Sequence, residues 1–495
     1  MRDHIFPPDV TPEEPHRIAK SVRFGGSSEK RELEQVFSFV TEKEHQPRPI
    51  HPHPVPPRRL ISRFSLPIIV LLVQLWIVVF RRPLTAPVPS LSPTFLSECN
   101  ALLFPTPTTF SSRLSRLSTI LAASDSVFVA EPGPTAQYFV GSFASSDWWL
   151  SERPFLISIA SEGDIVFLVP GFERLRASLI AVPEEIKNQT RFLEWKESDD
   201  PYAILREYYG GRGKRVVVDS MVRSFIAEGL EGQFEKGDAE DLARIKLIRE
   251  RKDEREIGLL RCANQMTLHA IRKTKARMNF GITEAQTREI LEEEMVEAGL
   301  TGGDGLVLFG ENAALPHGSG TDRKLGKEDF VLIDAGGKFG GYVSDITRTF
   351  ALSKSKIPKA HLEIWETVRL AQHAPFDLLL SSRFSHPPML GELDASARDL
   401  VNAKYNASDF EIFTHRLGHG IGLEGHEGPY VVQGPLGQKQ VEIGHVFSLE
   451  PGIYLPGQRG KGVGVRLEDC FVVRKEGDHL SGEWLSGPVR AWGDI

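Results

Sequence analysis

The spacing of apolar and polar residues divides this chain into segments of different character. Residues 1–57 contain ten prolines and many charges without a sustained apolar period, and such a composition cannot bury enough surface to fold. An uncharged apolar run follows from Phe64 to Phe80, with arginines on both sides. From residue 109 onward, short apolar runs alternate with amphipathic stretches, which predicts a folded structure of helices and strands.

The uncharged run predicts a single transmembrane helix, which we place at 61–82. Its length is at the short end of the roughly 17–25 residues that cross a bilayer. A buried core helix is disfavoured because basic residues flank both ends. A cleaved signal peptide is disfavoured because the run begins far from the N-terminus and no small-residue cleavage site follows it. Basic residues are more numerous before the run, which favours a cytosolic N-terminus and a lumenal or extracellular position for the rest.

The predicted transmembrane helix determines how we interpret the segments on either side of it. Residues 1–60 are then a disordered, Pro-rich cytosolic tail, and residues 83–108, which are rich in Pro, Ser and Thr, are a stalk. Glycosylation sequons begin at Asn188 and Asn406. They agree with a lumenal or extracellular chain without establishing it, because two sequons are close to chance in a chain of this length.

Composition narrows the possible functions only slightly. The net charge of −7 gives no electrostatic reason to expect nucleic acid binding. Cys99, Cys262 and Cys470 are far apart and odd in number. We therefore expect them to be buried small hydrophobic residues rather than a disulfide framework or a Cys-rich zinc motif. The length of 495 residues is sufficient for two folded domains plus extensions.

Residues 109–240 are predicted to form a small α/β domain. Its apolar runs are short and nearly continuous, as in largely buried strands. No catalytic constellation is evident, so we expect a structural or substrate-shaping role. The strands are expected at 127–129, 155–159, 165–169 and 216–218.

Residues 248–495 are predicted to form an α+β domain. Asp253 is a suitable N-cap for a first helix, and Thr283 with Gln286 forms a capping box for a second. Strands dominate from Leu306 onward. The expected helices are Asp253–Met278, Thr283–Gly299, 359–380 and 393–405.

The candidate chemistry begins with two aspartates in this second domain. An apolar strand ends at Asp334 and is followed by glycines, and the next strand carries Asp345, Thr347 and Thr349 on one face by its two-residue period. The intervening glycines favour a hairpin that brings both aspartates to one site. Two close carboxylates repel each other unless cations lie between them.

Histidines, glutamates and an arginine follow further along. They lie in a Gly-rich stretch, at the end of an apolar strand before Pro-Gly, and on one face of a later strand. In chain order they are His415, His419, His426, Glu450, Arg466 and Glu468. Four carboxylates and one histidine suit Mn²⁺, and Co²⁺ or Zn²⁺ could also occupy such a set. Two ions about 3.5–4 Å apart would hold a shared hydroxide as the nucleophile.

In this order, the motifs resemble those of the pita-bread metallopeptidases, in the branch of Xaa-Pro aminopeptidases and prolidases. The resemblance covers residues 248–475 by motif, and residues 109–235 resemble more weakly the family's creatinase-like N-terminal domain. It implies an α+β pita-bread (creatinase/aminopeptidase-like) catalytic domain preceded by a smaller α/β domain. The tail, anchor and stalk lie outside it.

The resemblance implies a metal ligand at each of five positions. Asp334 resembles the bidentate ligand of one ion, and Asp345 and Glu468 resemble bridging ligands. His419 resembles the only nitrogen ligand. Glu450 resembles a ligand that also takes the proton from the attacking water.

The resemblance also implies four residues that serve the substrate. His426 resembles the histidine that contacts the substrate and shuttles protons to the leaving amine. His317 and His415 resemble histidines on the substrate side. Arg466 resembles the arginine that orients the site near Glu468.

The implied activity is release of the N-terminal residue that precedes proline, by attack of the hydroxide that bridges two ions. A prolidase acting on Xaa-Pro dipeptides stays open, because that choice depends on how the cleft is closed. Methionine aminopeptidase is disfavoured by the extra N-terminal domain. A metal-free creatinase-type enzyme and a membrane-tethered binding protein are both disfavoured by the complete ligand set.

Two further expectations come from the comparison with the family pattern. The family's N-terminal domain often joins subunits, so a homodimer is a hypothesis. Residues 381–390 stand where the family usually has a short turn between helices, and we interpret them as a surface loop insertion.

Overall fold

The computed structural model describes residues 88–407, 411–457, 462–492 and 495. The predicted transmembrane helix at 61–82 and the predicted tail lie outside these residues. Within the described part of the chain, no helix is both long enough and apolar enough to cross a bilayer.

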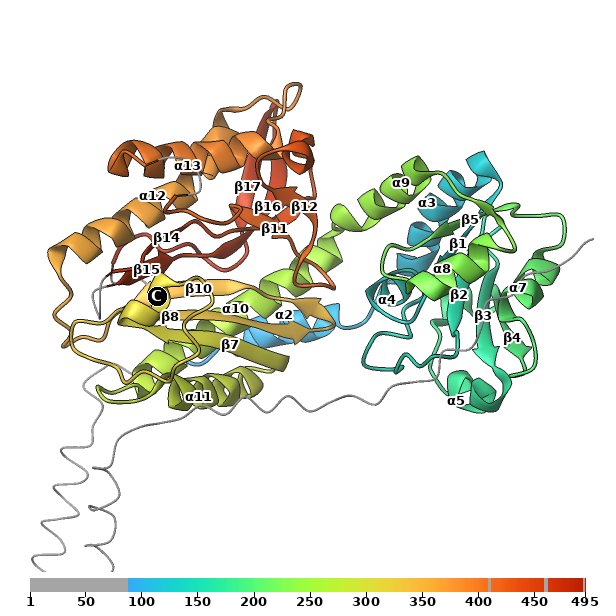
Figure 1. Ribbon diagram of the computed structural model, residues 1–495, viewed down its shortest axis with the longest axis horizontal. Helices are drawn as coiled ribbons and strands as arrows, with labels where there is room; N and C mark the ends of the chain where they lie inside the picture. Colours follow the sequence, from blue (N-terminus) through green and yellow to red (C-terminus); the bar gives the residue numbers. More distant parts are fainter. Residues whose placement is uncertain (1–87, 408–410, 458–461, 493–494) are drawn as a thin grey trace, which may run out of the picture. The chain divides into compact units, whose positions relative to one another are not determined.

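The N-terminal domain is built on a six-stranded sheet with the order β4–β3–β2–β1–β5–β6. Its β1–β2 and β2–β3 pairs are antiparallel, and its β3–β4, β1–β5 and β5–β6 pairs are parallel. The four predicted strands are confirmed, and β4 and β6 are the two edge strands of the sheet; β1 to β5 are labelled in Figure 1. The strands are β1 (Ser126–Ala130), β2 (Leu156–Ala160), β3 (Ile165–Pro170), β4 (Thr190–Trp195), β5 (Arg215–Val218) and β6 (Glu235–Lys236).

Short helices connect and cover these strands. β1, β2 and β3 are buried along their whole length, which explains why their sequences are continuous apolar runs rather than alternating ones. The helices are α3 (Thr109–Ser124), α4 (Pro134–Val140), η1 (Gly171–Glu173), α5 (Arg174–Ser178), α6 (Glu184–Lys187), α7 (Pro201–Tyr209) and α8 (Ser224–Glu231), and α9 (Ala239–Glu250) leads to the second domain.

The first half of the C-terminal domain pairs two helices with a sheet. α10 (Glu254–Arg277) and α11 (Glu284–Glu297) begin where predicted, because complete capping boxes form at Asp253 and at Thr283. The sheet has the order β10–β8–β7, and β9 pairs with β8. Its elements are β7 (Thr301–Phe309), η2 (Gly310–Ala314), β8 (Val331–Phe339), β9 (Tyr342–Val343) and β10 (Ile346–Phe350).

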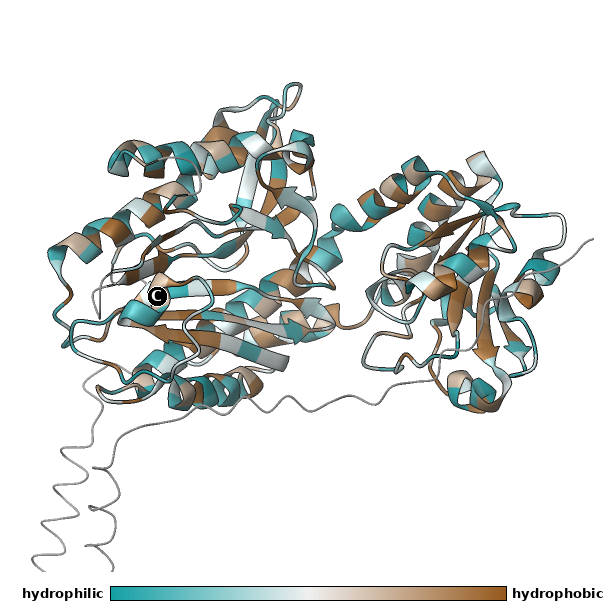
Figure 2. Cartoon of the chain, viewed as in Figure 1, coloured by the Kyte–Doolittle hydropathy of each residue, from teal (hydrophilic) through white to brown (hydrophobic). Residues whose placement is uncertain are grey.

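The second half repeats this plan with a five-stranded sheet, β12–β11–β13–β16–β17, and a two-stranded ribbon, β14–β15. In Figure 1 the sheets lie between the α10–α11 pair and the α12–α13 pair, and in Figure 2 apolar residues concentrate on the strands. The elements are α12 (Lys359–Ser381), α13 (Leu390–Tyr405), β11 (Gly418–Gly420), β12 (Glu427–Val431), η3 (Pro435–Gln438), β13 (Val446–Leu449), β14 (Gly452–Leu455), β15 (Val463–Arg466), β16 (Asp469–Glu476) and β17 (His479–Trp484). An α+β domain preceded by a smaller α/β domain is therefore confirmed.

A helix occupies part of the segment interpreted as a stalk. α2 (Pro93–Leu102) has Pro93 at its first turn, and the Ser92 hydroxyl accepts a hydrogen bond from the Phe95 N–H, a favourable start for a helix. Phe95 and Leu102 pack against the main hydrophobic core. The stalk interpretation is wrong for these residues, because the Pro- and Ser-rich composition concealed a short helix that is held by tertiary contacts.

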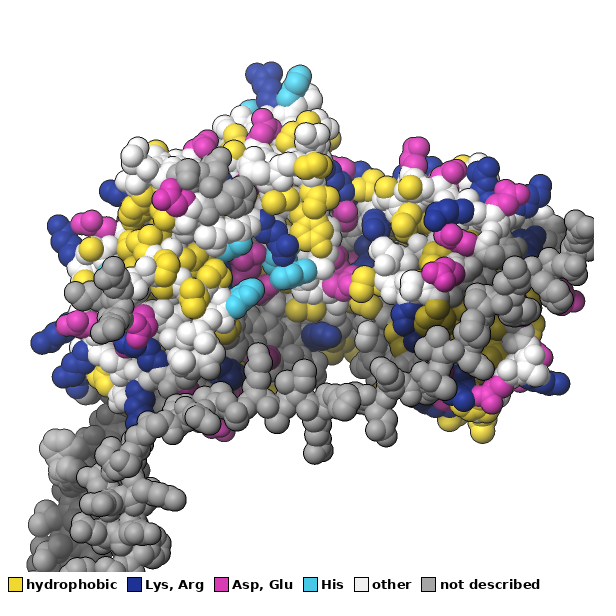
Figure 3. Space-filling view, viewed as in Figure 1, with side chains coloured by type: hydrophobic (Ala, Val, Ile, Leu, Met, Phe, Trp, Pro, Cys, Tyr) yellow, Lys and Arg dark blue, Asp and Glu magenta, His cyan; other side chains and the backbone are white. Residues whose placement is uncertain are grey.

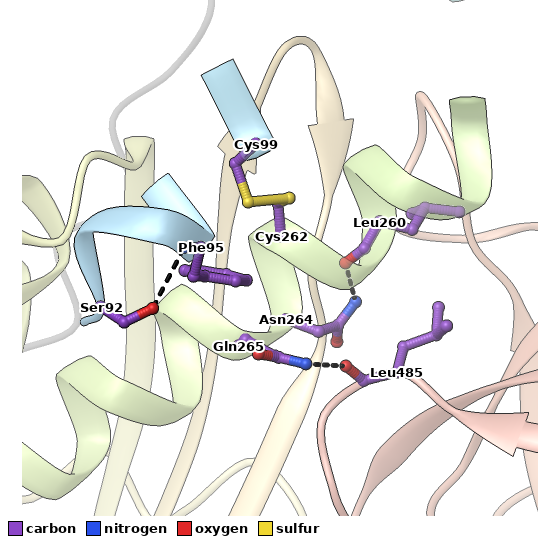
Figure 4. The surroundings of a disulfide bond; sticks show 8 residues. All are labelled: Ser92, Phe95, Cys99, Leu260, Cys262, Asn264, Gln265 and Leu485. Atoms are coloured by element: carbon purple, nitrogen blue, oxygen red, sulfur yellow. Dashed lines mark hydrogen bonds between the residues drawn. A yellow bond between two sulfur atoms is a disulfide. The ribbon is translucent and has the colours of Figure 1, made fainter. Parts of the chain in front are cut away.

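The prediction for the cysteines also needs correction. Cys99 of α2 and Cys262 of α10 form a disulfide, with Cα atoms 5.9 Å apart (Figure 4). Cys470 is free and buried, as predicted. The two bonded cysteines are 163 positions apart, so nothing local in the sequence marks them as partners.

Replacing both bonded cysteines, Cys99→Ser with Cys262→Ser, is expected to lower the free energy of unfolding by about 2–4 kcal/mol, because the cross-link restricts the unfolded chain. Urea unfolding of the wild type and the double variant measures this difference. Repeating both titrations with a strong reductant is the control, and the two curves should then converge. Equal stability under oxidising conditions would contradict the prediction.

Candidate metal centre

The two predicted aspartates face each other across a hairpin. Asp334 lies within β8, and Asp345 immediately precedes β10. The antiparallel register pairs Thr347 with Asp334, and the chain reverses at Gly340 and Gly341, both of which have positive φ. The predicted hairpin is confirmed. Its turn lies beyond the end of the apolar run, because strand β8 continues through Gly336 and Gly337 to Phe339.

The other predicted ligands come from three further places in the sheets. His419 lies at the centre of β11, Glu450 directly follows β13, and Glu468 lies between β15 and β16. Ligand atoms within 4.8 Å of one another form three overlapping groups. These groups are Asp334–Asp345–Glu468, His419–Glu450–Glu468 and Asp345–His419–His426. The fold thus gathers all five predicted ligands, with His426 beside them.

Negative charge is concentrated in this cluster. Burial, together with the charges of Asp334 and Glu450, raises the pKa of Asp345 well above its usual value. Burial and the charges of Asp345, Glu450 and Asp334 raise the pKa of Glu468 in the same way. Adjacent buried carboxylates cannot all ionise without a compensating cation.

Glu468 supplies a structural test of whether these residues suit a cation. Its Oε2 accepts a hydrogen bond of 2.7 Å from the Thr347 hydroxyl, whereas its Oε1 is buried without a hydrogen-bond partner among the described residues. A buried carboxylate oxygen without a partner is costly, and a cation held with the neighbouring carboxylates would satisfy it. The donor set therefore fits divalent metal ions.

His419 presents one nitrogen to this cluster. Its Nδ1 lies 3.1 Å from the carbonyl oxygen of Gly420 and donates to it, so the neutral form of the ring has its lone pair on Nε2. Nε2 lies 3.3 Å from Glu450 and 3.6 Å from Asp345. This is the arrangement in which a backbone carbonyl orients a metal-binding imidazole.

The pKa of Glu450 is lowered despite the burial of this side chain. Burial by itself would raise its pKa, but in the metal-free protein the hydrogen bond and positive charge that His419 has when both its ring nitrogens are protonated outweigh that effect, and the pKa of Glu450 is lowered. Ser448 lies 3.4 Å from Glu450 and accepts a hydrogen bond from the backbone N–H of His419. The Ser448 hydroxyl thus connects the backbone of His419 to the carboxylate of Glu450.

Gly418 makes the close approach of β11 and β13 possible. A Cβ atom at this position would lie 1.8 Å from the carbonyl oxygen of Ser448. We expect Gly418→Ala to displace His419, to weaken metal binding and to lower stability by about 1–3 kcal/mol. Calorimetric metal titration and urea unfolding measure these effects. Gly211→Ala is the control, because a Cβ there meets no atom within 4 Å; equal behaviour of the two variants would contradict the prediction.

Arg466 lies beside the cluster, as predicted. Its Nη2 donates to Asp334 at 2.6 Å, and its Nη1 donates to the Tyr454 hydroxyl at 2.9 Å and to the Pro316 carbonyl at 3.2 Å. His317, next to Pro316, is exposed. The arginine therefore links Asp334, a candidate metal ligand, to the loop that carries the predicted substrate-side histidine.

The remaining two histidines have different surroundings. Both ring nitrogens of His415 have protein partners, the Arg416 carbonyl at 2.8 Å and the Tyr454 hydroxyl at 2.9 Å. His426 is exposed, and its ring centre lies 3.9 Å from that of His419. Partial desolvation of the ring, together with the charges of His419 and Arg416, lowers the pKa of His426 to about 4. Figure 3 shows histidine side chains gathered on the surface of the C-terminal domain.

Several contacts that support the site were absent from the sequence analysis. A buried ion pair of 2.7 Å between Arg348 of β10 and Asp469 of β16 joins the two halves of the C-terminal domain. Asp469 directly follows Glu468 in the chain. Lys252 holds the buried side chain of Glu427 at 2.8 Å, next to His426 in the chain. Arg348, Glu427 and Asp469 each adjoin a motif residue, so their positions could have suggested them. The partner of each is more than one hundred positions away in the sequence.

Comparison with known proteins identifies the family. The model of metallopeptidase family M24 matches residues 258–475. An uncharacterised peptidase of Schizosaccharomyces pombe is 36% identical over 377 residues, which are 74% of this chain and 79% of the relative. The chain belongs to metallopeptidase family M24. The family and the pita-bread fold that the motifs implied are therefore confirmed.

Two more M24 relatives are similar over most of their length. The Xaa-Pro dipeptidase of Lactobacillus delbrueckii subsp. lactis is 30% identical over 74% of this chain and 96% of its own. The crystal structure of dipeptidase PepE from Mycobacterium ulcerans superposes with a TM-score of 0.67 and 26% identity, covering 78% of this chain and 97% of that one. These two alignments cover 74% and 78% of the chain, which is more than the part that begins at residue 258. The likeness therefore extends into the N-terminal domain.

Proposed function

We propose that this chain is a metal-dependent dipeptidase that cleaves Xaa-Pro dipeptides. The observation that carries the proposal is the cluster of five ligand residues around the buried Oε1 of Glu468, which lacks a partner among the described residues. A catalytically inactive binding protein would not require four mutually repelling carboxylates to be held together, and a metal-free creatinase-type enzyme would not require the full ligand set.

The relatives favour a dipeptidase over an aminopeptidase, although the motifs alone placed the aminopeptidase first. Dipeptidase names occur both among sequence relatives and among solved structures with substantial coverage. An X-Pro aminopeptidase from Thermotoga maritima is 24% identical, a similarity that supports a common fold alone. The aminopeptidase is therefore kept as the second outcome of the experiment below.

Each side chain has a role in this proposal. Asp334, Asp345, His419, Glu450 and Glu468 would hold two divalent ions, for which Mn²⁺ is our first candidate. When bound, such ions activate water and polarise the peptide carbonyl. Glu450, itself a member of the cluster, would take a proton from the attacking water, and His426 would contact the substrate.

Hydrolysis by the purified full chain tests the proposal. The protein would be stripped of metal, reloaded with Mn²⁺ and given an Xaa-Pro dipeptide, an Xaa-Pro-Yaa tripeptide and a Met-Ala-Yaa tripeptide. Cleavage confined to the dipeptide establishes the dipeptidase, and cleavage of the Xaa-Pro tripeptide establishes the aminopeptidase. Cleavage confined to the third peptide, or no cleavage with metal bound, would refute the proposal.

We also propose that the enzyme is a single-pass membrane protein with its catalytic domain in an oxidising, lumenal or extracellular compartment. The Cys99–Cys262 disulfide supports this position, because disulfides form and persist mainly in such compartments. Asn188, in the first sequon, is exposed. The span itself rests on the sequence pattern alone.

Fractionation of cells that express the full chain is expected to leave it in the membrane pellet after alkaline extraction, with residues 83–495 protected from added protease. Deleting residues 1–82 should release the protein into the soluble fraction. A full chain that never sediments with membranes would contradict the proposed anchor. The proposed homodimer is tested separately by sedimentation, and only monomer at micromolar concentration would exclude it.

A further inference from the structure

The three histidines of the β11–β12 region differ in which nitrogen carries the proton. A neutral imidazole has one N–H donor and one acceptor nitrogen, and the partners determine which is which. His419 has its proton on Nδ1, because that atom faces the Gly420 carbonyl. His415 also has its proton on Nδ1, which faces the Arg416 carbonyl, so its Nε2 accepts from the Tyr454 hydroxyl.

His426 has the opposite arrangement. Its Nδ1 lies 3.1 Å from Nη2 of Arg416. A guanidinium group has only donors and keeps its charge, so the Nδ1 of His426 must be the acceptor. The single proton of the neutral ring is then on Nε2.

Arg416 is itself well placed to impose this state. Its guanidinium lies over the ring of Tyr430, 5.2 Å from the centroid, and Tyr430 pairs with His419 across β11 and β12. Its backbone carbonyl is held by His415. The guanidinium of Arg416 is thus in contact with Tyr430 and His426, and its backbone carbonyl is in contact with His415.

No carboxylate competes for this cation. In the described part of the chain Arg416 forms no ion pair, and its Nε is buried without a hydrogen-bond partner. Here its hydrogen bond to a side chain goes to a histidine at the candidate site.

We propose that Arg416 is a positioning residue that holds His426 in the neutral tautomer with its proton on Nε2. The ring then donates a hydrogen bond from Nε2 to the bound substrate and does not accept one there. The inference rests on the proposed peptidase function only for the role of that donated hydrogen bond. The tautomer itself is a property of the protein without substrate.

Nitrogen NMR of the full chain tests the tautomer directly. Histidine ring nitrogens would be labelled with ¹⁵N, the protein loaded with diamagnetic Zn²⁺, and the His426 signals assigned by their loss in His426→Gln. We expect an unprotonated Nδ1 and a protonated Nε2 in the wild type. Arg416→Ala should give a mixture of tautomers, and Arg416→Lys, which keeps a donor and a charge, should restore the wild-type pattern at least in part.

Kinetics provide the second measurement. Arg416→Ala is expected to lower kcat roughly 10- to 100-fold with little change in KM, and Arg416→Lys should recover part of the loss. An unchanged tautomer in Arg416→Ala would overturn the inference. A rise in KM for the dipeptide alone would also overturn it, because Arg416 would then bind the substrate carboxylate instead. A wild-type tautomer as predicted, with no peptide cleaved, would refute the proposed function and leave the tautomer assignment standing.

Discussion

Replacing Glu450 by glutamine is expected to lower kcat by roughly 10²–10⁴-fold, the range that a positioned proton acceptor contributes. Glutamine has nearly the same shape, so the contacts around Ser448 and His419 can persist. It cannot accept the proton of a water molecule, because its pKa as a base is far below that of a carboxylate. Steady-state hydrolysis of an Xaa-Pro dipeptide measures the loss.

Three controls separate this loss from indirect effects. The metal content of Glu450→Gln should be compared with that of the wild type, because Glu450 is also a proposed ligand. Its thermal unfolding midpoint should stay close to that of the wild type. Glu363→Gln, on the exposed surface of α12, should retain full activity. Substantial turnover by Glu450→Gln with its metal bound would contradict the assigned role.

Removing the metal is expected to abolish activity and to make stability depend on pH in a characteristic direction. In the metal-free fold the pKa values of Asp345 and Glu468 are raised, so the folded state holds their protons more tightly than the unfolded chain does. Their contribution to stability is complete below the pKa values of the unfolded chain. It is lost as the pH rises through the higher values of the folded state.

Metal-free protein should therefore lose stability with rising pH over this window, and bound metal should reverse the loss. At a free metal concentration one hundred times Kd, the gain is about 2.7 kcal/mol from mass action. Urea unfolding at a series of pH values, with and without Mn²⁺, measures both effects. The double variant Asp345→Asn with Glu468→Gln is the control, since it should lack this pH dependence. Metal-free wild type that matches the double variant at every pH would contradict the prediction.

Local signals in the sequence predicted much of the framework. The capping boxes at Asp253 and Thr283 define the starts of α10 and α11, because each is complete within four residues. The buried strands β1 and β3 were predicted from their continuous apolar runs. α2 was missed because its stability depends on packing against α10, which a local pattern does not contain.

The candidate site, like the fold, could be predicted from the sequence only in part. Its ligand residues could be named from their motifs, since each motif carries its own residue types and order. The groups that orient these residues could not be named, because their contacts depend on strand pairing: Tyr454 is 39 positions from His415, and Arg416 meets His426 across the ten positions that separate them. The pairing of Cys99 with Cys262 was missed for this reason as well.

The disulfide between α2 and α10 turns the whole N-terminal domain into a covalently closed ring, because β1 through β6 all lie between the two cysteines. A single proteolytic cut inside that ring leaves both fragments bonded, so the domain stays attached to the catalytic half until a reductant opens the bond. A cut ahead of Cys99 has a different outcome. It would separate the ring and the metal centre together from everything N-terminal to them, so that shedding from a membrane would release both domains as one piece.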